Sequence, residues 1–208
     1  MRFQSTLTLQ RPLPEFSAEV IREERSQCRV PCDVAMHAGP IHRAFIEALP
    51  EAWRADPDVE IFSRLLWLKP GWYPIALGYH LDWGSSPGCV ETLMANFGGC
   101  SYTEFVDDTF DLPDDGDRRT WGHRVEAMVE RGELRTARLP ANTLARFDNA
   151  SWHRAMPAET EGWRILVRAI RGLDPAHQHN GAGTFTTVRN TYRPTSPEER
   201  RRHAPYRA

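Results

Sequence analysis

Two side chains of types that bind metal ions stand two positions apart in the segment GYHLDWG, residues 78–84. His80 offers an imidazole nitrogen and Asp82 offers a carboxylate. Residues i and i+2 of a β-strand point to the same face of a sheet, so a strand here would aim both side chains at one ion. Because an H-x-D pair also occurs by chance on solvated strands, it indicates a metal site only where the chain supplies a third ligand.

A third ligand of a suitable type lies in the segment FDNASWHRAMPA, residues 147–158, where His153 stands at the start of a predicted strand. Two imidazoles and one carboxylate fill one face of an octahedral metal ion and leave the opposite positions open, as in non-haem Fe(II) oxygenases. A structural zinc ion would instead favour a closed set of four ligands. The three residues together therefore indicate a catalytic metal.

An arginine follows at a spacing that extends this pattern. Arg164 opens the apolar segment GWRILVRAIRG, residues 162–172, with ten residues between it and His153. With this arginine the chain resembles the Fe(II)/2-oxoglutarate-dependent oxygenase superfamily, whose pattern is H-x-D, a distal histidine, and an arginine roughly ten residues later. The resemblance covers about residues 65–172.

The resemblance implies a role for each of these residues. His80, Asp82 and His153 would bind Fe(II) and form the catalytic centre, with 2-oxoglutarate and O2 taking the open positions. The guanidinium of Arg164 would hold the far carboxylate of 2-oxoglutarate, since its fork of donors suits a carboxylate better than lysine does. The products would be succinate, CO2 and an oxidised substrate. In related halogenases a small residue replaces the carboxylate, so Asp82 predicts hydroxylation or a similar oxidation.

Several other residues are candidates for binding the cosubstrate or the substrate. Asn96 and Thr103 lie on predicted strands next to the site, and in the family an amide or hydroxyl there often helps to hold 2-oxoglutarate. Tyr79, Trp83 and Tyr102 could line a substrate pocket, because ligand sites commonly have aromatic walls. For all of them, ordinary packing in the sheet or core is the alternative.

The role of Arg168 stays open between three interpretations. On a strand it would share one face with Arg164, pointing into the fold. In sulfonate-oxidising relatives the corresponding arginine contacts an anionic substrate, which would imply a small, anionic substrate here. Arg168 could instead bind the cosubstrate, or could be structural and pair with Asp82 or Asp148.

The remaining sequence predicts the elements that must position these residues. A strand is predicted over residues 3–10 and helices over 14–27, 39–56 and 120–134. Strands are predicted within residues 60–83, 90–99, 101–110, 143–149, 151–158 and 162–172, and another within 183–192. Many short strands preceded by helices predict a mostly β protein with flanking helices, built as an antiparallel sandwich or barrel. The resemblance implies a double-stranded β-helix, the cupin-like jelly-roll barrel.

The length of 208 residues fits one domain. We expect residues 1–60 to supply an N-terminal strand and helical support, residues 61–175 the jelly-roll core with the site, and residues 176–208 a C-terminal extension. Among the 26 basic residues only Lys69 is a lysine, a composition typical of a GC-rich bacterial genome. The sequence indicates nothing about the oligomeric state.

Net charge and hydropathy set limits on location and partners. The net charge of −2 argues against binding to duplex nucleic acid. The chain has neither an apolar run long enough to span a membrane nor the apolar core of a signal peptide, which predicts a cytoplasmic protein with reduced cysteines. The pair Cys28 and Cys32 in CRVPC could bind zinc, but no second pair supports such a site.

Two other functions fit parts of the pattern. A cupin-like metalloenzyme that does not use 2-oxoglutarate would share the barrel, but such folds often use three histidines and a glutamate. A non-catalytic jelly-roll binding protein would need the polar residues only to satisfy one another. The H-x-D spacing and Arg164 favour the oxygenase over both.

Overall fold

The structure is a computed structural model that describes residues 1–75, 78–82, 90–114, 120–173 and 183–185. The strands are β1 (Arg2–Ser5), β2 (Thr8–Pro12), β3 (Ser26–Pro31), β4 (Glu60–Leu68), β5 (Glu91–Phe97), β6 (Thr103–Val106), β7 (Asp108–Asp111), β8 (Thr136–Leu139), β9 (Thr143–Asp148), β10 (His153–Ala155), β11 (Gly162–Arg171) and β12 (Gly183–Phe185). The helices are α1 (Ala18–Glu23), α2 (Cys32–Ala35), α3 (Pro40–Ala48), α4 (Glu51–Arg54) and α5 (Trp121–Glu130). None of these helices has the length and apolar character needed to cross a bilayer.

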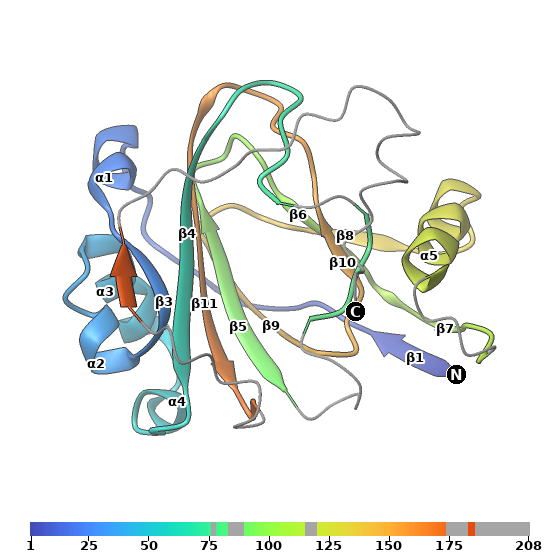
Figure 1. Ribbon diagram of the computed structural model, residues 1–208, viewed down its shortest axis with the longest axis horizontal. Coiled ribbons are helices and arrows are strands. Elements are labelled where there is room, and N and C mark those ends of the chain that lie inside the picture. The colour runs from blue at the N-terminus through green and yellow to red at the C-terminus, as the bar shows by residue number, and fades with distance from the viewer. Residues whose placement is uncertain (76–77, 83–89, 115–119, 174–182, 186–208) are drawn as a thin grey trace.

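Two antiparallel sheets and one strand pair organise the described chain, so the prediction of a mostly β protein with flanking helices is confirmed. The large sheet has the order β12-β3-β4-β11-β5-β9-β2, the smaller sheet has the order β10-β6-β8, and β1 pairs with β7. Figure 1 shows helices α1 to α4 on one side of the large sheet, with the smaller sheet and α5 beyond its other side. Closure of the sheets into a barrel stays a prediction.

The alternation of side chains along β11 explains why this strand lies between two layers. Ile165, Val167 and Ala169 are fully buried in the core that the helices cover, together with helix residues such as Phe45. Arg164, Leu166 and Arg168 point to the other face and line a cavity. The prediction that Arg164 and Arg168 share one strand face is therefore confirmed.

A buried polar network fixes the helical layer to β4. The carboxylate of Glu24 accepts hydrogen bonds from the backbone N–H groups of Ile41 and His42 at 3.2 and 3.1 Å, which satisfies the first turn of α3. The His42 ring lies 2.6 Å from Glu24 Oε1 and 2.8 Å from Ser63 Oγ, and all three side chains are buried. The network thus links the end of α1, the start of α3 and the sheet.

The predicted strand over residues 3–10 is wrong in one respect, since it is two strands in different sheets. β1 pairs with β7, whereas β2 pairs with β9 at the edge of the large sheet. Between these two strands the backbone carbonyl of Thr6 accepts a hydrogen bond from the Ser151 hydroxyl at 3.0 Å. This carbonyl therefore bonds to a side chain and not to a neighbouring strand. The first residues of the chain therefore bridge both layers instead of extending one.

The N-terminal helices are shorter than predicted, and the segment 1–60 holds three strands where one was expected. The helix over 14–27 is reduced to α1, because residues from Ser26 onward join the large sheet as β3. The helix over 39–56 ends as α3 and restarts as α4, because Pro50 cannot donate the backbone hydrogen bond that would continue it. Strand β8 was not predicted.

Gly98 makes the sharp turn that sends the chain from β5 toward β6. Its φ is +83°, and a Cβ there would lie 2.1 Å from the backbone carbonyl oxygen of Trp163. We expect Gly98→Ala to lower the free energy of unfolding by about 3 kcal/mol, from backbone strain and the clash together. Gly132→Ala is the matched control, because Gly132 has φ +71° but open space around it, so only about 1 kcal/mol should be lost. Equal losses for the two variants in urea denaturation would contradict this account.

Candidate metal centre

His80 and Asp82 do not lie on the strand that the sequence predicts. The chain after β4 turns at Lys69–Trp72, and Gly78 has a φ of +89°, so no ladder forms over the described part of this segment. His80 instead makes an isolated bridge to His153, with N–H···O distances of 2.9 and 3.1 Å in the two directions. This bridge, and not a shared strand face, brings the distant histidine to the H-x-D segment.

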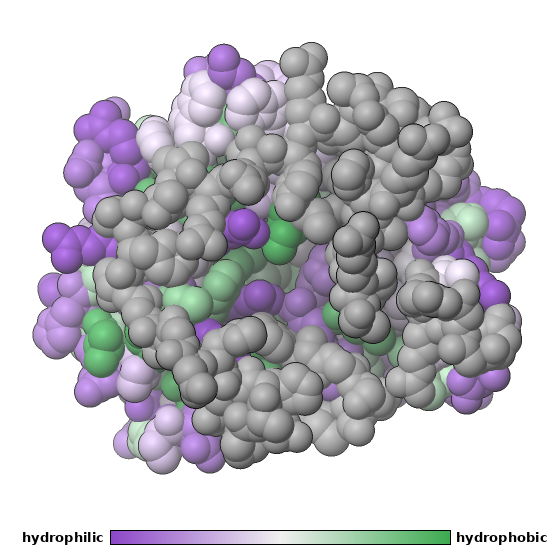
Figure 2. All heavy atoms as spheres, viewed as in Figure 1, coloured by the Kyte–Doolittle hydropathy of each residue, from purple (hydrophilic) through white to green (hydrophobic). Residues whose placement is uncertain are grey.

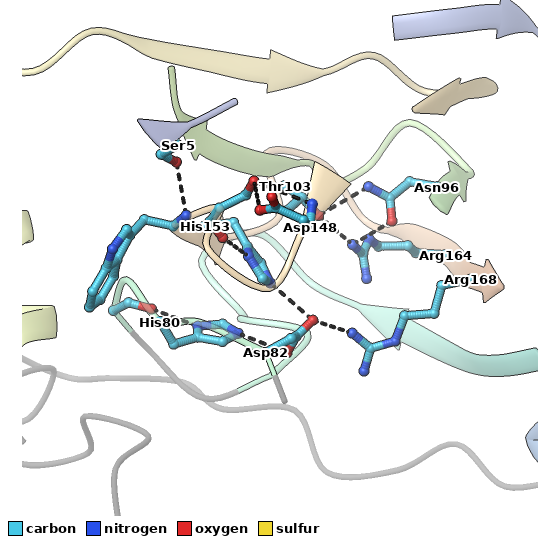
Figure 3. Close-up of polar contacts among 12 residues, drawn as sticks. Ser5, His80, Asp82, Asn96, Thr103, Asp148, His153, Arg164 and Arg168 are labelled. Carbon is cyan, nitrogen blue, oxygen red and sulfur yellow. Dashed lines mark hydrogen bonds and ion pairs between the residues drawn. The ribbon is translucent and has the colours of Figure 1, made fainter. Parts of the chain in front are cut away.

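His153, His80 and Asp82 converge on one point, as Figure 3 shows. Their possible ligand atoms all lie within 4.8 Å of one another. Asp82 Oδ2 lies 3.4 Å from His153 Nε2, and Asp82 Oδ1 lies 4.0 Å from His80 Nε2. Among the residues that the structure describes, this is the one group of three or more candidate ligands close enough to hold an ion. The cysteine site considered for Cys28 and Cys32 has no such group around it.

Backbone carbonyl groups fix which ring nitrogen of each histidine faces Asp82. His80 Nδ1 lies 3.1 Å from the carbonyl oxygen of Gly78, and His153 Nδ1 lies 3.0 Å from that of Ser151. A carbonyl oxygen only accepts, so each Nδ1 must carry the proton that it donates. In the neutral rings both Nε2 atoms then direct lone pairs toward a carboxylate. That arrangement fits a cation held between them, and outer hydrogen bonds of this kind are typical of metal-bound histidines.

The electrostatics keep His80 and Asp82 in the form that binds metal ions. Burial and the nearby His153 ring lower the pKa of His80 to about 4, so the ring is neutral at pH 7. Burial acts to raise the pKa of the Asp82 carboxyl, but the charge of Arg168 and the hydrogen bond with His153 outweigh it and hold the pKa well below its usual range. Asp82 is therefore an ionised ligand beside a neutral one.

Arg164 is a buried cation next to this group. Its side chain is 3% exposed, and its NH2 nitrogen donates to Asn96 Oδ1 at 2.7 Å and to Thr103 Oγ1 at 3.3 Å. Its Nε has no hydrogen-bond partner, and among the described residues no carboxylate forms an ion pair with it. Burial lowers the pKa of Arg164 to about 10, so it remains charged at pH 7. A buried guanidinium held only by neutral groups fits an anion that is not part of the chain.

Asn96 and Thr103, which were predicted to help hold the cosubstrate, are thus both in contact with Arg164, and a third hydrogen bond joins them. Asn96 Nδ2 donates to Thr103 Oγ1 at 3.1 Å across the space between β5 and β6. The two side chains belong to different sheets, so the amide–hydroxyl pair orients the guanidinium between the layers.

The structure places Arg168 in contact with Asp82. Arg168 NH1 donates to Asp82 Oδ2 at 2.5 Å, and the guanidinium lies 4.9 Å from the centre of the Phe62 ring. The other acid considered, Asp148, accepts hydrogen bonds from Ala150 and Ser151 in the turn before β10. Pairing with Asp82 is therefore the contact that the geometry supports.

A cavity between the two sheets connects these groups. Figure 2 shows the molecule hollowed in this region, with hydrophilic and hydrophobic side chains together in the walls. The cavity is lined by Phe62, Arg64, Pro74, Ile75, His80, Asp82, Met94, Thr103, His153, Ala155, Arg164, Leu166 and Arg168. Arg64 was not predicted as a site residue. Its signal is a charged residue directly before the apolar run LLWL of β4, opposite Leu166 in the β4–β11 ladder.

The aromatic candidates do not join the walls of this cavity where the structure describes them. Tyr79 is 1% exposed and packs in the core under α5, on the far side of its segment from the metal ligands. The Tyr102 ring lies under the guanidinium of Arg138, 4.0 Å from its carbon. Trp83 lies outside the described residues. Placing Tyr79 in a substrate pocket is therefore wrong, whereas a substrate-binding role for Tyr102 stays a prediction.

Comparisons with known proteins leave the family of this chain open. The sequence matches no protein-family model, and no curated protein matches it significantly. Among solved structures it is similar to AviO1 from Streptomyces viridochromogenes Tue57, with 15% identity, coverage of 85% of this chain and 93% of that chain, and a TM-score of 0.47. It is also similar to a nickel complex of the non-haem monooxygenase ThoJ, with 13% identity, coverage of 86% and 89%, and a TM-score of 0.37. Values this low do not carry an activity over to the present chain.

Proposed function

We propose that this protein is an Fe(II)- and 2-oxoglutarate-dependent oxygenase that oxidises a small molecule. The observation that carries the proposal is the presence, in one cavity, of a converging His-Asp-His group and a buried arginine held only by neutral side chains. The first feature suits a metal ion and the second suits an organic anion. A site that binds only a metal ion, or only an organic anion, would not explain both features.

His80, Asp82 and His153 would hold the iron. The two imidazoles present their Nε2 lone pairs, and Asp82 supplies the negative charge. Three protein ligands leave positions for other groups, which is the donor set of non-haem Fe(II) oxygenases. Together, bound Fe(II), 2-oxoglutarate and O2 would supply an oxidation in which one oxygen atom enters the substrate, the other enters succinate, and CO2 is released. A carboxylate at position 82 favours transfer of oxygen over transfer of a halide.

Arg164 would bind the far carboxylate of 2-oxoglutarate. Its Nε, which has no hydrogen-bond partner in the protein, would donate to this carboxylate, and its positive charge would pair with the negative one. Asn96 and Thr103 orient the plane of the guanidinium. The pairing would take place at a position that is 3% exposed, where water screens it little. The cosubstrate would thus be oriented by its remote end while its other end lies toward the metal ligands.

The walls of the cavity favour a small substrate that carries an anionic group. The described wall holds three guanidinium groups, those of Arg64, Arg164 and Arg168, and one carboxylate. With one arginine assigned to the cosubstrate and Arg168 positioned on Asp82, Arg64 is a further guanidinium in the wall near β4. Leu166, Met94 and Phe62 supply apolar contact beside it. This combination suits an organic acid or ester of moderate size.

We further propose that the sheets close as a double-stranded β-helix in a single domain, with residues 61–175 as its core. All proposed ligands fall within that range, and the large and small antiparallel sheets face each other across the cavity. Strands β1, β2 and β3 would extend this core from the N-terminal side.

The proposal is tested by anaerobic binding of 2-oxoglutarate to protein loaded with Fe(II). We expect a metal-to-ligand absorption band on titration, and release of succinate in air when a panel of small organic acids is supplied. Metal binding without the band would favour a metalloenzyme that does not use 2-oxoglutarate. Failure to bind any divalent metal near neutral pH would favour a non-catalytic binding protein and would overturn the proposal.

A further inference from the structure

The segment that carries His80 has little regular structure to hold it. Within the described residues its backbone pairs with the sheets through one isolated bridge to His153, and no ladder continues on either side of that bridge. A metal centre needs its ligands fixed to within a fraction of an ångström. Some other contact must therefore set the distance between His80 and β10.

Such a contact lies on the opposite face from the metal ligands. Along an extended chain, neighbouring side chains point to opposite faces. His80 and His153 face the cavity, so Tyr79 and Arg154, one step away in each segment, face the layer under α5. The carboxylate of Glu104 on β6 lies between them, directly across the ladder from Arg154.

One carboxylate oxygen binds both neighbours of the two histidines. The hydroxyl of Tyr79 donates to Glu104 Oε1 at 2.7 Å, and Arg154 donates to the same oxygen from Nε at 2.9 Å, with NH2 at 2.8 Å. The Arg154 guanidinium also lies 4.5 Å from the centre of the Tyr79 ring. Arg154 NH1 reaches Glu126 on α5 at 3.2 Å, so the helix anchors the group from outside.

We propose that Tyr79, Glu104 and Arg154 form a positioning network that sets the separation of His80 and His153 and so determines metal affinity. The proposal rests on the metal site of the proposed function. The hydrogen bonds and ion pairs described for these three side chains join them to one another and to Glu126, not to the metal ligands. The network acts through the backbone, because it clamps residues 79 and 154 while the bridge joins residues 80 and 153. Outer contacts that orient metal ligands typically contribute about 10- to 100-fold in affinity.

The test is a titration of the metal-free chain with Co(II), whose visible absorption reports both affinity and coordination geometry. Tyr79→Phe removes only one hydroxyl, and we expect the dissociation constant for Co(II) to rise about 10-fold or more, with an altered spectrum. Glu104→Ala should have at least as large an effect, and Glu104→Gln, which keeps an oxygen acceptor, should retain more affinity than Glu104→Ala. Glu133→Gln is the control, because Glu133 forms an exposed ion pair with Arg131 away from the site.

Thermal unfolding of the same metal-free variants separates positioning from simple stability. A merely structural role would lower the melting temperature of Tyr79→Phe and leave its Co(II) affinity and spectrum within twofold of the original protein, which would overturn the network. The variant Tyr79→Phe/Glu104→Ala should lose little more affinity than Glu104→Ala alone, because the tyrosine hydroxyl acts through its hydrogen bond to the Glu104 carboxylate. Independent losses would also count against it. If the unchanged protein binds no Co(II), the proposed function itself fails, which is a different result from binding that the variants do not alter.

Discussion

Replacement of Asp82 by alanine is expected to abolish retention of a metal ion. Asp82 supplies the anionic ligand of the group, and its oxygens lie 3.4 and 4.0 Å from the two histidine nitrogens. Without it, the two imidazoles remain beside the positive charge of Arg168, which repels a cation. We expect the affinity for Fe(II) or Ni(II) to fall by more than about 100-fold, beyond the usual effect of an outer contact. Metal content after anaerobic loading and desalting measures this loss.

The same change should also destabilise the metal-free protein, and a second variant separates the two effects. Asp82→Ala leaves the largely buried Arg168 without its carboxylate, which typically costs about 3 kcal/mol or more. Asp82→Ala/Arg168→Met removes both partners and should recover much of that stability while still failing to retain metal. Asp108→Asn changes an exposed carboxylate and should leave metal content unchanged. Normal metal content in the folded double variant would remove Asp82 from the ligand set.

Replacement of Arg164 by methionine is expected to remove 2-oxoglutarate binding without loss of stability. Loss of one partner of a buried charge pair costs about 2–5 kcal/mol of binding free energy, which corresponds to an affinity decrease of about 30-fold or more. The metal-loaded variant should still bind Fe(II), because Arg164 makes no contact with the three ligands in the described structure. An anaerobic titration with 2-oxoglutarate, followed through its absorption band, measures the change.

Stability distinguishes a binding role for Arg164 from a structural one. A buried arginine without a carboxylate partner is a desolvated charge, so an apolar side chain of similar length should leave the metal-free protein as stable or make it more stable. Saturating 2-oxoglutarate should raise the melting temperature of the metal-loaded original protein but not that of Arg164→Met. Arg131→Met, at an exposed ion pair, is the control. A variant that unfolds more readily yet binds 2-oxoglutarate normally would show that Arg164 is structural.

The sequence predicts the faces of β11 well because alternation there is strict and both faces are filled. It also predicts the members of the His-Asp-His group, whose convergence the structure shows. It places His80 and Asp82 wrongly on a strand, because the aromatic and branched residues before His80 are typical of strands while Pro70, Gly71 and Pro74 interrupt the ladder. His153 does begin a strand, as predicted. Which segment His80 pairs with depends on contacts with residues far along the chain, and no local pattern contains them.

The error over Tyr79 could have been avoided from the pattern alone. If His80 points into the cavity, the residue next to it in an extended segment must point away. Tyr79 then belongs to the opposite layer, where Glu104 receives its hydroxyl. The sequence does not indicate the roles of Glu104 and Arg154 in the same way. Each is an ordinary charged residue on a short strand, and their pairing follows only from the register of β6 and β10.

The central position of β11 in the large sheet has a consequence for how the protein matures. β11 lies between β4 and β5, so β4 and β5 cannot join one sheet until residues 162–171 have been synthesised. β11 also carries Arg164. β10, which carries His153, comes shortly before β11 in the sequence. Because synthesis runs from the N-terminus, His80 and Asp82 are made before His153 and Arg164. Sheets built from segments that lie far apart in the sequence form slowly. The proposed metal ligands can therefore converge only after residues 153–155 have been synthesised.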